Sequence, residues 1–389
     1  MPRHLTAIER SRDVFDGRAG YRIRAEWGHV AILEGGGHIC ELALNCVPGI
    51  NPLWTPPWKT IDAERYSPAK HRRVYGPPPD GRLLAGIAGH SLSFDHFGPP
   101  SPEETAAGLS THGEAPSARW RLTERDEKQL RLTYGCRLRA AQIEFSRTLS
   151  LDRRNPVIYC EERARNLSPY DRPISWNEHV TFGPPFLESN ATIFDMPATR
   201  AKVCPPNFSD KIFLQPDREF TWPRAPRKDA GQADLRTTPD EVFGHYTAQL
   251  LDPALDVAFV SASNPRQRLL VVYAFPRADF PWVGNWEERN SRPAPPWNGR
   301  TFCRGIEFST TPFAIPRRET VDQGPLFEEP TFRWLPGGST RKVRFAIMLF
   351  QVPEDFAGVK QLTIERGRAM IAGRESPGRQ LSVRIRDFF

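Results

Sequence analysis

The chain has 389 residues, a mass of 44.2 kDa and a formal net charge of +7. A chain of this length can bury roughly 75% of its unfolded surface without disulfides or metals. Its composition, 39% hydrophobic and 25% charged, excludes a disordered polymer. It contains no run of about 18 apolar residues, which excludes a membrane-spanning helix.

The first 17 residues are polar and charged, with neither an apolar signal-peptide core nor a small-residue cleavage site. We therefore expect a cytoplasmic protein, with residues 1–20 as an extension before a single domain over residues 21–389. The six cysteines form no CxxC pair, so reduced, mostly buried thiols are expected instead of disulfides or a zinc site. The arginines are scattered and no DNA-binding motif is present, so we expect no nucleic-acid partner.

Proline is the compositional outlier, because its 39 residues are about twice the usual 5%. Proline interrupts helices and central strands, so the chain is expected to consist of short segments. Apolar residues alternate over residues 143–151 and again over 341–349, which predicts half-buried antiparallel strands. Many short strands between Gly/Pro turns favour a sandwich or barrel. Similar runs occupy residues 30–33, 39–44, 157–163, 257–262 and 269–275.

Three proline-held segments are loop-like and rich in aromatic residues. They are residues 51–58, residues 76–81 running toward 97–100, and residues 280–286 continuing to 295–299. Indole rings on such loops suit the apolar faces of sugars. The alternative is that these rings cap the ends of sheets, where an aromatic body with a polar handle packs well.

Two short histidine motifs precede the middle of the chain. Residues 89–100 contain two histidines with Asp95 between them, but no second cluster completes a ligand set, so no metal site is expected. Residues 111–115 contain the pair His112-Gly, which lets backbone approach closely beside an imidazole. A small-ligand pocket would use that arrangement, although a solvated loop histidine is the alternative.

A third motif covers residues 176–187 and contains His179. If residues 175–182 form a strand, His179 and Glu178 point to opposite faces, because side chains alternate along a strand. A Gly-Pro-Pro stop then places His179 near the strand end, where a cleft can open. Histidine gives and takes protons near neutral pH, so His179 is a candidate acid or base. A hydrogen-bonded structural histidine is the alternative.

A fourth motif, residues 304–313, places Glu307 between Ile306 and Phe308. A buried, unpaired carboxylate is costly, so Glu307 either faces solvent from an amphipathic strand or is held in a site. Desolvation in a site would raise its pKa and make it a better base.

Taken in order, these motifs resemble the aldose 1-epimerase (galactose mutarotase) family. The resemblance covers roughly residues 20 to 350, and it implies an all-β fold, a large antiparallel β-sandwich with a sugar bound in a cleft on one sheet. It also implies that no cofactor is needed. The matching elements are residues 89–100, His112-Gly113, His179, Gly305-Ile-Glu307 and the turn at Trp334–Gly337.

The resemblance also implies roles for individual residues. Glu307 would take the proton of the anomeric hydroxyl, and His179 would protonate the ring oxygen. The ring would open, rotate about C1–C2 and reclose as the other anomer, while His112 hydrogen-bonds the sugar. The family's early arginine has no clear counterpart, since His96 or Arg82 stands nearest. Its mid-chain aspartate has no clean match either. The remaining candidate substrate-binding residues are His96, Trp286, Asn285, Glu287 and Arg304.

Three functions remain open. The main prediction is an aldose 1-epimerase-like isomerase that acts on a sugar or sugar derivative. The alternatives are a non-catalytic carbohydrate-binding protein on the same fold and a glycoside hydrolase or lyase. Hydrolysis needs two carboxyl groups about 5 Å or about 6.5–9.5 Å apart, and Glu307 with Glu287 or Glu288 is the pairing available. The identity of the sugar and the oligomeric state stay open.

Overall fold

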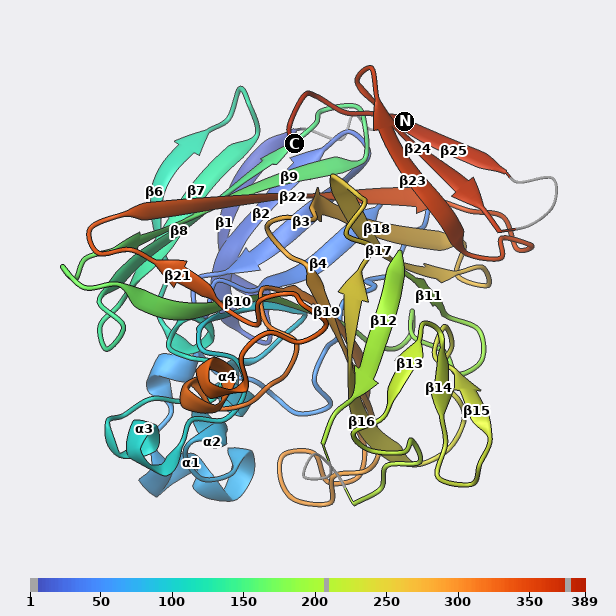
Figure 1. Ribbon diagram of the computed structural model, residues 1–389. Helices are drawn as coiled ribbons and strands as arrows, with labels where there is room; N and C mark the ends of the chain where they lie inside the picture. The colour runs from blue at the N-terminus through green and yellow to red at the C-terminus, as the bar shows by residue number, and fades with distance from the viewer. Residues whose placement is uncertain (1–5, 206–209, 375–378) are drawn as a thin grey trace.

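The computed structural model describes residues 6–205, 210–374 and 379–389. Within these residues the strands form antiparallel sheets of 14, 8 and 3 strands, and short helices gather at one end of the molecule (Figure 1). The predicted all-β class and large antiparallel sandwich are confirmed.

The larger sheet runs in the order β1-β2-β3-β4-β5-β10-β20-β19-β16-β12-β13-β14-β15, with β21 paired to β10. Its strands are β1 (Ala7–Phe15), β2 (Arg18–Ala25), β3 (Gly28–Leu33), β4 (Ile39–Leu44), β5 (His90–Asp95), β10 (Arg172–Phe182), β12 (Ala198–Val203), β13 (Glu219–Thr221), β14 (Arg224–Pro226), β15 (Gln232–Asp234), β16 (Phe243–Leu251), β19 (Trp282–Arg289), β20 (Phe302–Ser309) and β21 (Arg333–Leu335).

The second sheet runs in the order β11-β17-β18-β22-β9-β8-β7-β6, and a small third sheet runs in the order β23-β24-β25. Their strands are β6 (Arg121–Asp126), β7 (Arg131–Leu138), β8 (Ile143–Leu151), β9 (Val157–Asn166), β11 (Ile193–Asp195), β17 (Val257–Asn264), β18 (Leu269–Pro276), β22 (Thr340–Gln351), β23 (Val359–Glu365), β24 (Arg368–Gly373) and β25 (Gln380–Arg384).

The helices are short, as the density of proline predicts. They are α1 (Pro68–Tyr75), α2 (Asp80–Gly86), α3 (Pro102–Ala106) and α4 (Arg317–Gln323), with 3-10 turns at Ala63–Arg65 and Ala115–Ser117. None of the helices in the described ranges combines the length and the apolarity that a membrane crossing requires.

Burial separates the molecule into layers. The main core lies between the two large sheets and includes Phe94 and Trp176 from one sheet and Phe145 and Phe345 from the other. A second cluster packs the three-stranded sheet onto the outer face of the eight-stranded sheet. A third cluster, rich in tryptophan, joins the other face of the 14-stranded sheet to α2 and the neighbouring loops. This third layer surrounds the candidate site.

The strand predictions from residue alternation are confirmed, and β8 has the predicted bounds. The segment 280–286 was expected to be a loop, but most of it belongs to β19, a strand buried on both faces. A strand of this kind shows no polar and apolar alternation, which is why the sequence pattern missed it. The predicted boundary at residues 20/21 falls inside β2, and β1 pairs with β2 as part of the large sheet. All six cysteines are unpaired, and all except Cys46 are buried, as expected.

Candidate active site

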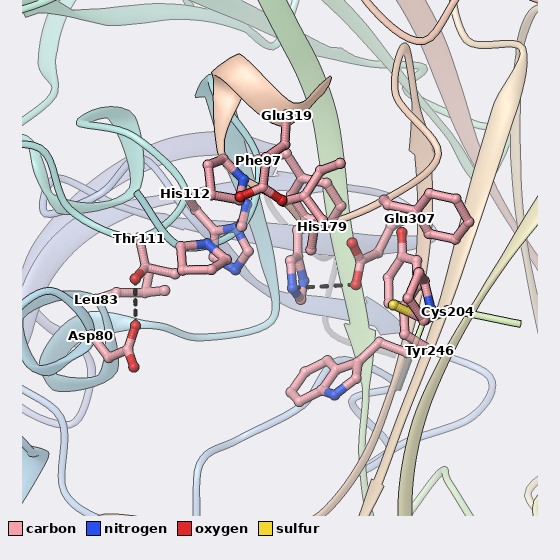
Figure 2. A pocket seen from close by; sticks show the side chains of 18 of the residues that line it. Asp80, Leu83, Phe97, Thr111, His112, His179, Cys204, Tyr246, Glu307 and Glu319 are labelled. Carbon is pink, nitrogen blue, oxygen red and sulfur yellow. Dashed lines mark hydrogen bonds and ion pairs between the residues drawn. The ribbon is translucent and has the colours of Figure 1, made fainter. Parts of the chain in front are cut away.

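The centre of the site is a histidine–carboxylate pair held by strand register. β10 and β20 pair antiparallel, with His179 directly opposite Glu307. Side chains directly opposite each other leave the same face of a sheet, so the two groups meet. His179 Nε2 lies 3.3 Å from Glu307 Oε1 (Figure 2). We refer to His179 and Glu307 as the proton pair.

Two polar neighbours on β10 orient the proton pair. The two-residue period of the strand places Asn177, His179 and Thr181 on one face. Asn177 Nδ2 donates a hydrogen bond to Glu307 Oε2 at 3.3 Å. Thr181 Oγ1 lies 3.0 Å from His179 Nδ1, so it engages the ring nitrogen that faces away from Glu307. Each member of the pair is therefore held by its own partner.

Burial shifts the two pKa values in opposite directions, because desolvation penalises the charged form of each group. Burial raises the pKa of Glu307 to about 8. The hydrogen bond from Asn177 lowers this pKa, but by less than burial raises it. Burial lowers the pKa of His179 to about 4. At neutral pH the proton pair therefore holds one titratable proton, on the carboxyl group of Glu307, and His179 is a neutral imidazole. In the tautomer with its hydrogen on Nδ1, His179 Nε2 can accept the Glu307 proton.

Two glycines make room for the carboxylate and for a tyrosine beside it. A Cβ atom at Gly305 would lie 2.7 Å from Glu307 Oε1, and one at Gly284 would lie 1.9 Å from the Tyr246 hydroxyl. Gly284 is the register partner of Glu307 on β19. The Gly305-Ile-Glu307 spacing thus has a steric reason, because the glycine and the carboxylate share one face of β20.

His112 reaches the same place from a loop. Its backbone N–H donates to Gly98 O at 3.0 Å, and its Nδ1 accepts from Gly98 N–H at 3.1 Å. These bonds leave Nε2 to carry the ring proton. The next residue, Gly113, has φ +77°, and a Cβ there would lie 2.2 Å from Phe94 O. His112 packs 5.3 Å from the His179 ring, and burial lowers its pKa well below the usual value, so it is a neutral donor.

These groups open into a cavity of about 600 Å³. The indole of Trp286 lies 5.6 Å from the His179 ring and 6.0 Å from the Trp297 ring. Both tryptophans line the cavity, as expected from the sequence. The lining side chains also include Asp80, Leu83, Leu84, Ile87, Phe97, Thr111, Lys202, Cys204, Tyr246, Arg292, Phe313, Ile315, Glu319 and Gln323.

Three of the expected sugar-binding residues face away from this cavity. Asn285 and Glu287 flank Trp286 on β19, so they point to the opposite face of the sheet. There Arg304 Nε donates to Asn285 Oδ1 at 2.9 Å, and His245 Nε2 lies 3.0 Å from Glu287 Oε1. Burial alone would raise the pKa of Glu287, but Arg304 and His245 bring it down to about 2. Their assignment to sugar binding is therefore corrected, since they form a buried polar cluster behind the site.

The two candidates for the early arginine do not line the cavity either. His96 is buried directly after β5, and Arg82 is an exposed residue of α2. The structure therefore gives neither residue a direct place in the site.

The carboxyl pairing expected for hydrolysis is also corrected. Glu287 lies behind the sheet, and Glu288 accepts hydrogen bonds from Ser291, including Ser291 Oγ at 2.7 Å. Neither carboxylate lines the cavity. The group that faces Glu307 is His179.

Glu178 also obeys the strand alternation and points into the core between the sheets. Arg147 Nη2 donates to Glu178 Oε2 at 3.0 Å, and His90 Nε2 lies 2.7 Å from the same oxygen. Arg147 also forms an ion pair with Glu162, and all these groups are fully buried. This network ties β10 to the second sheet directly beneath the proton pair.

Sequence reasoning missed Tyr246 and Thr181. Tyr246 lies in β16, which is buried along its whole length, so no alternation marks the tyrosine. Thr181 is two residues from His179. On a predicted strand this spacing places both side chains on the same face, and this was the signal that could have identified Thr181. Across the described part of the chain, no group of three or more His, Cys, Asp or Glu side chains is arranged to hold a metal ion.

The fold and the site together define a galactose mutarotase-like β-sandwich with a histidine–glutamate cleft. Solved structures with this architecture include a "putative aldose 1-epimerase" from Klebsiella pneumoniae, which has a TM-score of 0.62 and 13% identity and matches over 87% of this chain and 80% of its own. A galactose mutarotase-like protein from Clostridium acetobutylicum has a TM-score of 0.57 and 14% identity, over 89% and 98% of the two chains.

A galactose mutarotase related enzyme from Lactobacillus acidophilus has a TM-score of 0.55 and 13% identity, over 86% and 98% of the two chains. No protein-family model matches the sequence, and no curated protein matches it significantly. The resemblance drawn from the motifs is confirmed as a likeness of fold. At these identities the likeness concerns architecture and leaves the reaction to the site itself.

Proposed function

We propose that this protein is an aldose 1-epimerase-like isomerase that interconverts the anomers of a sugar or sugar derivative without a cofactor. The observation that carries the proposal is the proton pair, a histidine facing a glutamate at 3.3 Å in a cavity. Ring opening needs one group that accepts a proton and one that donates a proton at the same time. A cytoplasmic location remains part of this proposal.

In the proposed mechanism, the proton pair first redistributes its single proton. Transfer from Glu307 to His179 Nε2 creates a carboxylate and an imidazolium, and the total number of bound protons stays the same. Glu307 then removes the proton of the anomeric hydroxyl, and the O–H electron pair forms the C1 carbonyl. The bond between C1 and the ring oxygen breaks, and His179 gives its proton to that oxygen.

Rotation about C1–C2 and the reverse proton transfers close the ring as the other anomer. The free aldehyde is the intermediate, so no oxidant, reductant or second substrate is required. Ring opening leaves Glu307 protonated and His179 neutral. The reverse transfers that close the ring recreate the carboxylate and the imidazolium, and return of a proton from His179 to Glu307 restores the starting state. Thr181, at 3.0 Å from Nδ1, would hold the imidazole so that Nε2 keeps facing the site throughout.

Substrate positioning would come from His112 and from the indoles. His112 Nε2–H is available as a donor because its Nδ1 already accepts from Gly98. Trp286 and Trp297 meet edge to face, with an interplanar angle of 83°, and present aromatic surface to the cavity. Such surface suits the C–H faces of a pyranose.

The test compares mutarotation rates with sugar binding. Glu307→Gln keeps the size and much of the hydrogen bonding but removes the base, so turnover should fall by about 10²–10⁴-fold while binding survives. His179→Asn should behave similarly. Polarimetry on freshly dissolved aldoses gives the rate, and isothermal titration with equilibrated sugars gives the affinity. Glu144→Gln, at an exposed position of β8, is the matched control.

Two results would count against the proposal. A Glu307→Gln protein with an intact rate would show that Glu307 is not the base. Wild-type protein that binds sugars without mutarotation above the spontaneous rate would identify a carbohydrate-binding protein on this fold.

A further inference from the structure

One wall of the cavity is aliphatic and aromatic, and the proton pair does not use it. Leu83, Leu84 and Ile87 come from α2 and its C-terminal cap, and Phe97 comes from the loop after β5. The wall is completed by the segment before α4. We call it the apolar wall, and it consists of Leu83, Leu84, Ile87, Phe97, Phe313 and Ile315.

The apolar wall is held together as a unit. Phe97 and Ile315 form a β-bridge, which fixes the loop after β5 against the segment before α4. Leu83, Phe97 and Phe313 are 2–3% exposed and belong to one hydrophobic cluster. Trp58 Nε1 donates to Leu84 O at 2.9 Å, which attaches α2 to the neighbouring loop. A ligand would therefore meet a prearranged apolar surface.

Two polar groups beside this wall, Thr111 and Asp80, are engaged with each other. Thr111 Oγ1 donates a hydrogen bond to Asp80 at the side of Leu83. Figure 2 shows Leu83, Thr111 and Asp80 on one side of His112, whereas Glu307 lies on the other side. The cavity thus extends past His112, away from the carboxylate that would act on the anomeric centre.

Size and chemistry indicate what this space receives. A volume of about 600 Å³ lies within the range of about 300–1,000 Å³ that is typical of sites for drug-sized ligands. A single hexopyranose is much smaller than such a ligand. Sugar hydroxyls placed against Leu, Ile and Phe side chains would lose hydrogen bonds to water without replacement, which costs free energy.

The geometry points to a substrate that is a reducing sugar with an aliphatic substituent on a carbon other than C1. This inference rests on the proposed function, because ring opening needs a free anomeric hydroxyl and so excludes a substituent at C1. The sugar ring would lie at the proton pair and His112, and the substituent would lie on the apolar wall. Leu83, Leu84, Ile87 and Ile315 would then determine specificity.

The test uses glucose and its methyl, butyl and hexyl ethers at C3 and at C6, with maltose as a polar extension of the ring. Isothermal titration with equilibrated sugars measures binding whether or not turnover occurs. Each buried CH2 contributes about a fourfold gain in affinity. We therefore expect at least about a tenfold rise from the methyl to the hexyl ether in one of the two series.

Variants locate the effect. Leu83→Asn should reduce the ratio of hexyl-ether affinity to glucose affinity by about tenfold or more. Ile315→Thr, at a half-buried position, provides a second measurement should Leu83→Asn fail to fold. Leu167→Asn, at a 37% exposed position outside the cavity, should leave the ratio unchanged.

The outcomes separate this inference from the proposed function. Affinity that rises with the length of the alkyl group, without any mutarotation, would support binding of the substituent to the apolar wall and would refute the proposed isomerase function. Mutarotation with equal affinity for all ethers would show that the apolar wall does not bind an aliphatic substituent, and it would leave the proposed isomerase function intact. Maltose binding more tightly than every ether, or no sugar binding at all, also overturns the inference.

Discussion

Replacing Glu307 by Gln should change how the stability of the folded protein depends on pH. Glu307 is 1% exposed, and burial raises its pKa from 4.5 to about 8. The folded protein therefore keeps this proton over a range in which the unfolded chain has released it. Gln carries no titratable proton, so the variant lacks this contribution altogether.

The size follows from proton linkage. Between pH 6.5 and pH 8, folded His179 is neutral, because its pKa is about 4, while the unfolded side chain, with a pKa of 6.5, changes from half protonated to neutral. This contribution is common to the wild type and Glu307→Gln, so it cancels when the two are compared. Over the same range unfolded Glu307 is ionised, whereas folded Glu307 changes from protonated to half protonated at its pKa of about 8. Glu307 then lowers stability by up to about 1.4 kcal/mol per pH unit, or about 1.6 kcal/mol over the interval.

Below pH 6.5 the two members of the proton pair offset each other. Between pH 6.5 and about pH 4.5, Glu307 is protonated in the folded state and ionised in the unfolded chain. Over the same range His179 is neutral in the folded state and protonated in the unfolded chain, so the two states bind equal numbers of protons on this pair. The fall in wild-type stability is therefore seen between pH 6.5 and pH 8. From the lower to the higher pH, Glu307→Gln should gain about 1.6 kcal/mol of stability relative to the wild type.

Urea denaturation followed by tryptophan fluorescence at constant ionic strength measures this difference. Glu144→Gln serves as the control for losing a carboxylate at an exposed position, and its pH profile should run parallel to that of the wild type. Parallel profiles for Glu307→Gln as well, within about 0.5 kcal/mol, would show that Glu307 is not desolvated as described.

Three further predictions test other parts of the site and its support. Mutarotation should follow a bell-shaped pH profile, because the proton pair loses its only proton above about pH 8 and gains a second proton below about pH 4; a flat profile after subtraction of the spontaneous rate would contradict this. Gly113→Ala should lower stability by more than about 1 kcal/mol, measured by urea denaturation, since it combines φ +77° with a contact to Phe94 O. Arg147→Met should cost about 3–5 kcal/mol, because it leaves Glu162 and Glu178 buried without their cation; an unchanged denaturation midpoint would show that the network is dispensable.

The sequence could predict features that depend on local periodicity. Alternation along β8 and β22 gave the strands, and proline density gave the short helices. Alternation also placed His179 and Glu178 on opposite faces of β10, where the structure has them. These properties follow from the two-residue period of a strand, which neighbouring residues establish on their own.

The same period excludes three of the candidate sugar-binding residues from the face that carries the proton pair. Asn285 and Glu287 adjoin Trp286, so they cannot share its face within one strand. The sequence of this segment does not show the pattern of a strand, because β19 is buried on both faces and carries no polar alternation. Arg304 lies three positions from Glu307 on β20, an odd spacing that also places it on the other face.

Strand pairing lay beyond the reach of the sequence. His179 and Glu307 are neighbours only because β10 pairs with β20 in one particular register, and a shift by one residue would send one of them into the core. That register depends on the packing of two sheets against a shared core and on long-range contacts. Candidate chemical groups could therefore be identified from the sequence, whereas the meeting of His179, Glu307 and His112 in one cavity was decided by tertiary structure.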